Sequence, residues 1–367
     1  MSQPTSFVLA PNLLSPSAPL APDAPQTKSA LPPPNFLADA AFPQARWSLG
    51  GALLYDSALV EFLKFLRTEV PVVAVRDVSG APPCAWTLDW YSTRPLVPPG
   101  TFSERVKKFS ELGVGFSLDF DNPHVGADAL EDVIGNTLLR SCATLSTMRV
   151  RVASEALADR IRAAFPQAKL HAGANLAVAA DARGNADFYR RAAEKFETVT
   201  LHPLDAADAD FLEKLLADVP ADRLEIEIND TCLRACPVRK EHLDTLAKMR
   251  LAPWDASLLQ RRHALLAQAA CENVCADPGN AAARAALLTR DERLRAYALG
   301  IRNFRIQAEK LRSELAFFWE LGSLMLTDAP EFWHKKAAFM ASSVNNVNAP
   351  VPVFKSGTSA FVMRKYE

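Results

Sequence analysis

Long apolar runs are missing from this sequence of 367 residues. No stretch reaches the roughly 18 apolar residues that a membrane-spanning helix needs, so we expect no membrane partner. The N-terminus lacks a basic segment followed by an apolar run, and it lacks the arginines of an organelle transit peptide. We therefore expect a cytoplasmic protein, in which cysteines more often serve metals or catalysis than disulfides.

A surplus of charge and several common motifs are also missing. The formal net charge is −1, so nothing global points to a nucleic-acid partner, although a local basic patch would still fit. No GxGxxG follows a strand-like segment and no P-loop occurs, so the usual nucleotide-binding signatures fail. The motifs GxSxG and HExxH are absent too, which leaves a peptidase mechanism with poor support.

Strand-like and helix-like segments alternate from Arg46 onward. Clear strand-like segments are VGFSLDF at 114–120, LEIEI at 224–228 and NFRI at 303–306. Repeated strand–helix units imply parallel strands with right-handed crossovers. We count seven plausible strands, with room for an eighth between His242 and Thr289. A TIM-like (β/α)8 barrel, regular or distorted, fits this pattern better than an open doubly wound sheet.

The domain organisation follows from composition. Residues 1–45 are rich in Pro and Ala and are predicted to be a disordered tail, because proline fixes φ and removes a backbone donor. The barrel is assigned to 46–325, and 326–367 to a C-terminal helical extension and tail. Two helices rich in Phe and Trp are predicted between Leu311 and Ser342.

The carboxyl ends of the strands supply the first candidate site residues, because barrel chemistry sits there. Asp119 is the candidate catalytic residue of this group. The candidate substrate-binding residues are Asn122, His171, His202, Asn229 and Gln307. Each of these residue types also serves as a cap or turn former, and Asn122 with the following proline is a ready turn.

The stretch NDTCLRACPVRKEH, at 229–242, follows LEIEI directly. If it is helical, the CxxxC spacing puts Cys232 and Cys236 on one face, about 5–6 Å apart at Cβ. A second CxxxC, Cys271 and Cys275, brings the total to four thiols, the complement of a 4Fe–4S cluster or a structural zinc. The alternative is that these cysteines are small buried apolar residues.

Charged residues accompany the first cysteine pair. His242 is a candidate general acid or base, and Arg239 is a second candidate catalytic residue. Lys240 is a candidate substrate-binding residue that could grip a carboxylate or phosphate. All three side chains would equally suit a solvated helix face.

This stretch resembles the N-x-x-C-x-x-x-C-P-x-R-x-x-H segment of the U-32 peptidase-like (collagenase-like peptidase) superfamily. GIRNFRIQ near Gly300 is similar to a late barrel strand of that superfamily. FSLDFDNPHV is similar to a strand and turn of its divergent, mostly uncharacterised branch. The resemblance covers about Arg46 to Met325 and implies a TIM-like barrel.

The resemblance also implies a function. Several members bind a 4Fe–4S cluster and support oxygen-independent hydroxylation of RNA bases or a quinone precursor, and others are described as peptidases. Carried over to this chain, Cys232 and Cys236 would be cluster ligands, and Cys271 or Cys275 would complete the set. The usual Gly-Arg after the late strand is here Ala308-Glu309, which puts the usual activity in doubt.

We therefore expect an iron–sulfur enzyme that modifies a small molecule, RNA or peptide, with an electron donor or partner protein. One alternative is a peptidase of the same fold. The other is a non-catalytic accessory or binding protein whose cysteines are structural. Sequence alone does not choose the substrate among these classes.

The tail assignment gives a first prediction. Deleting residues before Phe42 should leave the free energy of unfolding nearly unchanged, because a proline-dense segment contributes little to a core. Denaturant titration of the full and truncated chains checks this. A loss of more than about 2 kcal/mol, a large share of typical domain stability, would show that the tail packs on the barrel.

Overall fold

The computed structural model describes twelve stretches of the chain. These are residues 42–71, 73–88, 99–143, 148–229, 232, 236–252, 255–268, 288–307, 321–322, 324–325, 352–354 and 361–363. The chain divides into two compact units, Met1–Asn35 and Phe36–Glu367, and every described residue belongs to the second. Most of the predicted tail, Cys271, Cys275 and most of the predicted C-terminal helices lie outside the described residues.

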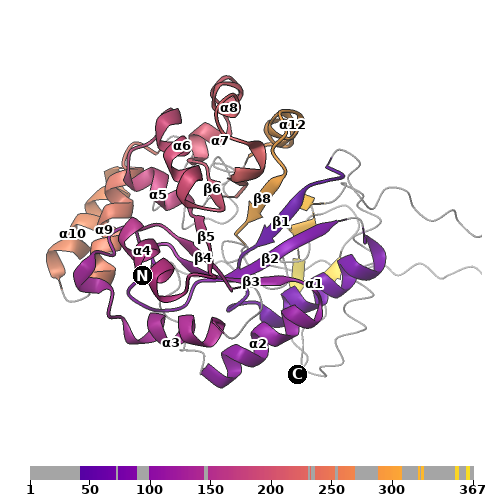
Figure 1. Ribbon diagram of the computed structural model, residues 1–367, viewed down its shortest axis with the longest axis horizontal. Helices are drawn as coiled ribbons and strands as arrows, with labels where there is room; N and C mark the ends of the chain where they lie inside the picture. Colours follow the sequence, from indigo (N-terminus) through magenta and orange to yellow (C-terminus); the bar gives the residue numbers. More distant parts are fainter. Residues whose placement is uncertain are drawn as a thin grey trace, which may run out of the picture. The chain divides into compact units, whose positions relative to one another are not determined.

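Eight parallel strands close into a barrel in the order β1 to β8 (Figure 1). Their bounds are β1 Arg46–Leu49, β2 Ala74–Gly80, β3 Gly115–Phe120, β4 Met148–Val152, β5 Lys169–Ala172, β6 Thr198–Thr200, β7 Leu224–Glu227 and β8 Asn303–Ile306. Strands β1 and β8 pair in parallel, which closes the ring. The predicted TIM-like (β/α)8 fold is thus confirmed.

Helices connect the strands. They are α1 Asp56–Glu69, α2 Pro99–Glu111, α3 Val133–Cys142, α4 Glu155–Ala164, α5 Ala174–Ala179, α6 Ala186–Lys195, α7 Pro203–Ala206, α8 Ala209–Leu216, α9 Arg239–Leu251, α10 Ala256–Gln268 and α12 Arg290–Ala298. Two short 3-10 turns are η1 Ala127–Ala129 and η2 Ala221–Arg223. Among the described residues, no helix is long and apolar enough to span a bilayer.

One strand expectation is wrong. The interval between His242 and Thr289 was expected to hold the eighth strand, but its described part forms helices α9 and α10. The RWSL segment, which the sequence predicts as a short strand, is the first strand, β1. Within the predicted C-terminal extension, the described residues form β9 (Pro352–Phe354) and β10 (Phe361–Met363), which pair in antiparallel fashion.

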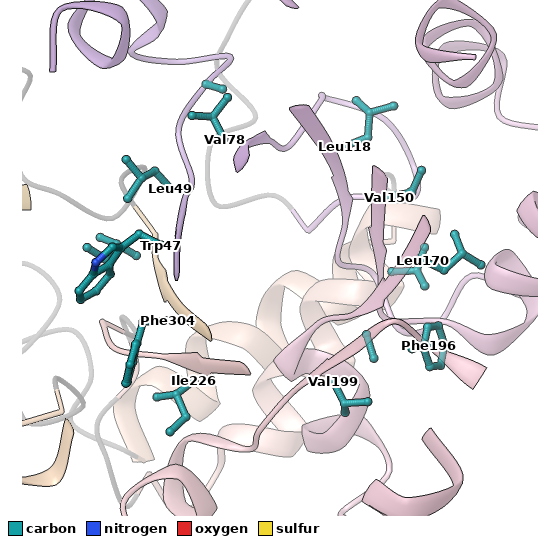
Figure 2. Packing of buried hydrophobic residues seen from close by; sticks show 14 of the residues in the cluster. Trp47, Leu49, Val78, Leu118, Val150, Leu170, Phe196, Val199, Ile226 and Phe304 are labelled. Atoms are coloured by element: carbon teal, nitrogen blue, oxygen red, sulfur yellow. The ribbon is translucent and has the colours of Figure 1, made fainter. Parts of the chain in front are cut away.

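The outer face of the strand ring is apolar. Figure 2 shows side chains such as Trp47, Leu118, Val150 and Ile226 directed away from the centre of the ring. They belong to one large buried cluster that includes helix residues, among them Phe62 of α1. Because side chains alternate along a strand, the polar residues between these positions face the interior.

This outer layer generates a prediction. Phe304 is fully buried and lies with its ring 5.4 Å from that of Trp47. Phe304→Ala should lower the free energy of unfolding by about 3–5 kcal/mol, since it removes buried area and leaves a cavity. Val133→Ala is the control, because Val133 is 76% exposed and should change stability by less than about 0.5 kcal/mol. Equal losses in both variants, measured by denaturant titration, would contradict the packing.

Candidate functional site

The interior of the barrel is polar, whereas such interiors are usually filled by Val, Ile and Leu. Every strand contributes a buried polar or charged side chain. The set is Ser48, Asp77, Ser79, Ser117, Asp119, Arg151, His171, Thr198, Thr200, Glu225, Glu227, Asn303 and Arg305. Side chains from strands that are not neighbours touch one another across the ring, so these residues fill the lumen rather than line an outer surface.

Arg151 and Glu225 form the centre of the lumen. Arg151 on β4 contacts Glu225 on β7, with 2.5 Å between Nη1 and Oε1. Thr200 donates to the same carboxylate over 2.9 Å. Arg76 on β2 reaches Glu225 as well, with Nη2 2.6 Å from Oε2, and Arg76 Nε lies 2.6 Å from Asp77 Oδ2. Ser48 donates to the same Asp77 side chain.

These contacts decide the charge states inside the barrel. Burial by itself would raise the pKa of Glu225, but Arg151, Arg76 and Arg305 hold that pKa well below its usual value. Burial would likewise raise the pKa of Asp77, and Arg76 lowers it. Both carboxylates are therefore ionised and paired, as buried charges must be.

His171 lies among these charges and stays neutral. Burial, with the nearby positive charges of Arg151 and Arg76, lowers its pKa from 6.5 to about 3. Its Nδ1 is 2.7 Å from the Thr198 hydroxyl. The side chain is enclosed in the lumen, with the residue only 2% exposed, so it is placed to shape the network rather than to meet substrate directly.

Arg305 links the lumen to the carboxyl-end mouth of the barrel. It donates to Asp119 Oδ2 over 2.6 Å and to Ser79 Oγ over 2.9 Å. It also donates to Gln307 Oε1 over 3.0 Å. Its Nε is 3.6 Å from Glu227 Oε2. One guanidinium thus fixes side chains from four strand ends, in the forked geometry for which arginine is suited.

Three further residues complete this layer. We call the layer the floor, and it consists of Asp119, Glu227, Asn229, Arg305 and Gln307. Gln307 Nε2 donates to Glu227 Oε2 over 2.8 Å. Asn229 accepts from the backbone N–H of Gln307 over 2.7 Å and donates to its carbonyl over 3.0 Å. Asp119 Oδ1 is buried and has no hydrogen-bond partner among the described residues, although Arg151 Nε lies 3.5 Å away.

Helices α9 and α10, which we call the cap, depart from the usual barrel course. Strand β7 lies opposite β3 in the closed ring, yet α9 follows β7 and packs beside α5 (Figure 1). Arg250 of α9 donates to the carbonyl of Cys84, which follows β2. Asn122, after β3, donates to the carbonyl of Ala247 over 3.3 Å. Helix α9 therefore docks on the connections after β2 and β3, not beside β7, the strand that it follows in sequence.

Cys232 and Cys236 belong to the connection between Asn229 and α9. Both are half-buried, and Cys236 packs against Val238 of the approach to α9 and Leu265 of α10. The described residues contain no group of three or more His, Cys, Asp or Glu side chains arranged to hold a metal. Cys232 and Cys236 therefore offer two sulfur ligands to a metal site. The other two candidate ligands, Cys271 and Cys275, lie outside the described residues.

The other predicted residues of this stretch lie on α9. His242 is buried, and burial together with the charge of Arg262 lowers its pKa, which keeps the ring neutral. Arg239 is buried at the first turn. Lys240 is exposed and pairs with Asp244 over 2.7 Å.

The structure brings some predicted residues together and separates others. Asp119, Asn229 and Gln307 share the floor. Asn122 serves the connections around it, since it donates to the carbonyl of Ala85 over 2.8 Å. His202 accepts at Nδ1 from the backbone N–H of Leu204 and so caps α7.

Sequence reasoning missed the partners that hold these residues. Arg151, Glu225, Glu227 and Arg305 were not among the candidates. Their signal was present in MRVRV, LEIEI and NFRI, where charge alternates with apolar residues. Strands of a parallel barrel usually read as continuous apolar runs, so strict alternation in them indicates a polar lumen.

Comparison with solved structures gives a likeness in fold. No family model matches the chain, and no curated protein matches it. The fold is similar to that of the U32 peptidase Mk0906, with 13% identity and a TM-score of 0.44 over 72% of this chain and 92% of that chain. At this level of identity and structural overlap, neither a residue role nor a function is carried over to this chain.

The neutral state of His171 predicts a pH dependence. The unfolded chain takes up a proton at this side chain below about pH 6.5, whereas the folded chain does so only near pH 3. Folding stability should therefore fall as pH decreases through this window, by at most about 1.4 kcal/mol per pH unit from this group. In His171→Gln the slope between about pH 6 and pH 5 should shrink by that amount. Unchanged slopes in denaturant titrations would contradict the buried neutral state.

Proposed function

We propose that this chain is an enzyme that holds a polar substrate at the mouth of its U-32-like barrel and carries an iron–sulfur cluster beside it. The substrate class is a small molecule, RNA or peptide, and the reaction is of the oxygen-independent hydroxylation type. One observation carries the proposal: the connection that contains Cys232 and Cys236 begins at Asn229, which joins the floor, and leads into α9, which docks on the connections after β2 and β3.

The burial of each cysteine indicates whether its thiol could become a thiolate ligand of the cluster. Burial raises the pKa of Cys84 and Cys142 to about 12, so both remain protonated and are poor ligands. Cys232 and Cys236 are half-buried. In the proposal they hold the cluster with Cys271 and Cys275, and the bound cluster would take up the electrons that hydroxylation releases and pass them to an electron acceptor.

The chain's own residues would bind and orient the substrate. Asp119 is buried and fixed at Oδ2 by Arg305, with Oδ1 facing Arg151, so it would hold the floor in place beneath the substrate. Glu227 and Gln307 are joined to each other and together offer a carboxylate and an amide at the same level. Because these groups are locked by the lumen, they need little rearrangement when a substrate arrives.

A second candidate function has its own support. Cys236 packs against Val238 and Leu265, as a structural cysteine would. In that case the protein is a non-catalytic binding or accessory protein. The peptidase alternative has less support, because the Thr198 hydroxyl that contacts His171 is enclosed in the lumen, where no peptide can reach it.

The test is iron and sulfide content after purification without oxygen. Wild type should carry a cluster, while Cys232→Ser and Cys236→Ser should each lose most of the iron, since one ligand in four is removed. Cys142→Ala is the matched control, because Cys142 is buried in α3 and should leave the iron content unchanged.

Two outcomes contradict the proposal. Wild type without iron or sulfide would favour the structural-cysteine function. Undiminished iron in Cys236→Ser would exclude that residue as a required ligand. Circular dichroism of each variant shows whether the fold is retained, so that loss of iron through unfolding is recognised.

A further inference from the structure

We infer that α9 is a cover that opens from the barrel mouth as a unit while the barrel stays folded. The inference rests on the proposed function in one respect, namely that substrate binds at the barrel mouth. The evidence for opening comes from how α9 is held, and it does not depend on any bound group.

The apolar contacts of α9 are separate from the main core. Among the described residues, Leu243, Leu246 and Ala247 of α9 form a small cluster with Leu88 and Val178 from the barrel side, and the partly buried Ala179 packs against it. The large core cluster, by contrast, runs through all eight strands and the helices around them. Regions with few buried apolar contacts open at lower free energy than the global core.

The outer helix of the cap adds little anchoring. Leu265 is the one buried residue recorded along α10 in the described chain, and it packs against Val238 and Cys236 within the cap segment itself. The ion pair between Arg261 and Glu241 likewise joins α10 to α9 and not to the barrel. These contacts of α10 therefore join it to α9 and to the approach to α9.

Besides the hydrogen bonds of Arg250 with Cys84 and of Asn122 with Ala247, a contact between two side chains links α9 to the connection after β3. His124 Nε2 lies 2.8 Å from Asp244 Oδ1, and Lys240 holds the other oxygen of Asp244. The backbone N–H of His124 is fixed separately by Asn122. Replacing the His124 side chain therefore removes the link and leaves the loop hydrogen bond in place.

The two ends of the connection that carries the cap meet at the end of β7. The backbone N–H of Leu288 donates to the carbonyl of Ile228 over 2.9 Å. Asn229 is then tied to Gln307 of the floor. These bonds keep the base of the connection on the barrel, so α9 can leave the opposite rim without disturbing the strands.

Native-state amide hydrogen exchange on the full chain tests the inference. Amides of α9, such as those of Leu246 and Ala247, should exchange through an opening that costs less than global unfolding, whereas amides of β4 and β7 exchange only with global unfolding. His124→Ala should speed α9 exchange by about two- to tenfold, the range expected for one lost hydrogen bond. Leu246→Ala should speed it further, since it removes an anchor of the small cluster.

Lys64→Ala is the control, because it breaks an exposed pair with Glu61 on α1 and should leave α9 exchange unchanged. The inference is overturned if α9 and β4 amides share one exchange free energy. It is also overturned if His124→Ala speeds all amides equally. Hydrogen exchange does not depend on the iron content. A protein without a cluster could therefore still show opening of α9, and a protein whose α9 does not open could still carry a cluster.

Discussion

Charges enclosed in a closed barrel must neutralise one another, and the rest of this structure depends on that pairing. The described strands bring the arginines Arg76, Arg149, Arg151 and Arg305 together with the carboxylates Asp77, Asp119, Glu225 and Glu227. A buried charge without a partner costs several kcal/mol, so each side chain is committed to a particular neighbour. The lumen is therefore a fixed electrostatic framework, enclosed by the apolar outer layer that packs against the helices.

That framework determines what the mouth can do. Arg305 reaches from β8 to Asp119 on β3, and it orients Gln307 at the same time. The floor is thus held from below, while the cap is held from the side by a small separate cluster and by the pair of His124 with Asp244. If α9 opens as inferred, a rigid floor and a movable helix at the mouth would suit binding a substrate and then excluding water from it.

The sequence predicted the barrel well and the site in part. Alternating strand-like and helix-like segments were enough for the fold, and the strand-end rule selected Asp119, Asn229 and Gln307, which do meet in the floor. It did not predict which charges pair, because Arg151 and Glu225 are far apart in sequence and meet only across the closed ring. Nor did it predict the course of α9, since helical periodicity in residues 239–251 says nothing about the rim on which the helix docks.

The pairing of Arg305 with Asp119 is the most direct test of this account, because it joins the lumen to the mouth. A double-mutant cycle with Arg305→Met and Asp119→Leu measures their coupling in the free energy of unfolding. Each single variant should lower the free energy of unfolding by about 3–5 kcal/mol, because it leaves a buried charge without its partner. The double variant should cost less than the sum of the two by at least about 1 kcal/mol. Additive losses, with coupling near zero, would contradict the claim that paired charges in the lumen hold the floor in place.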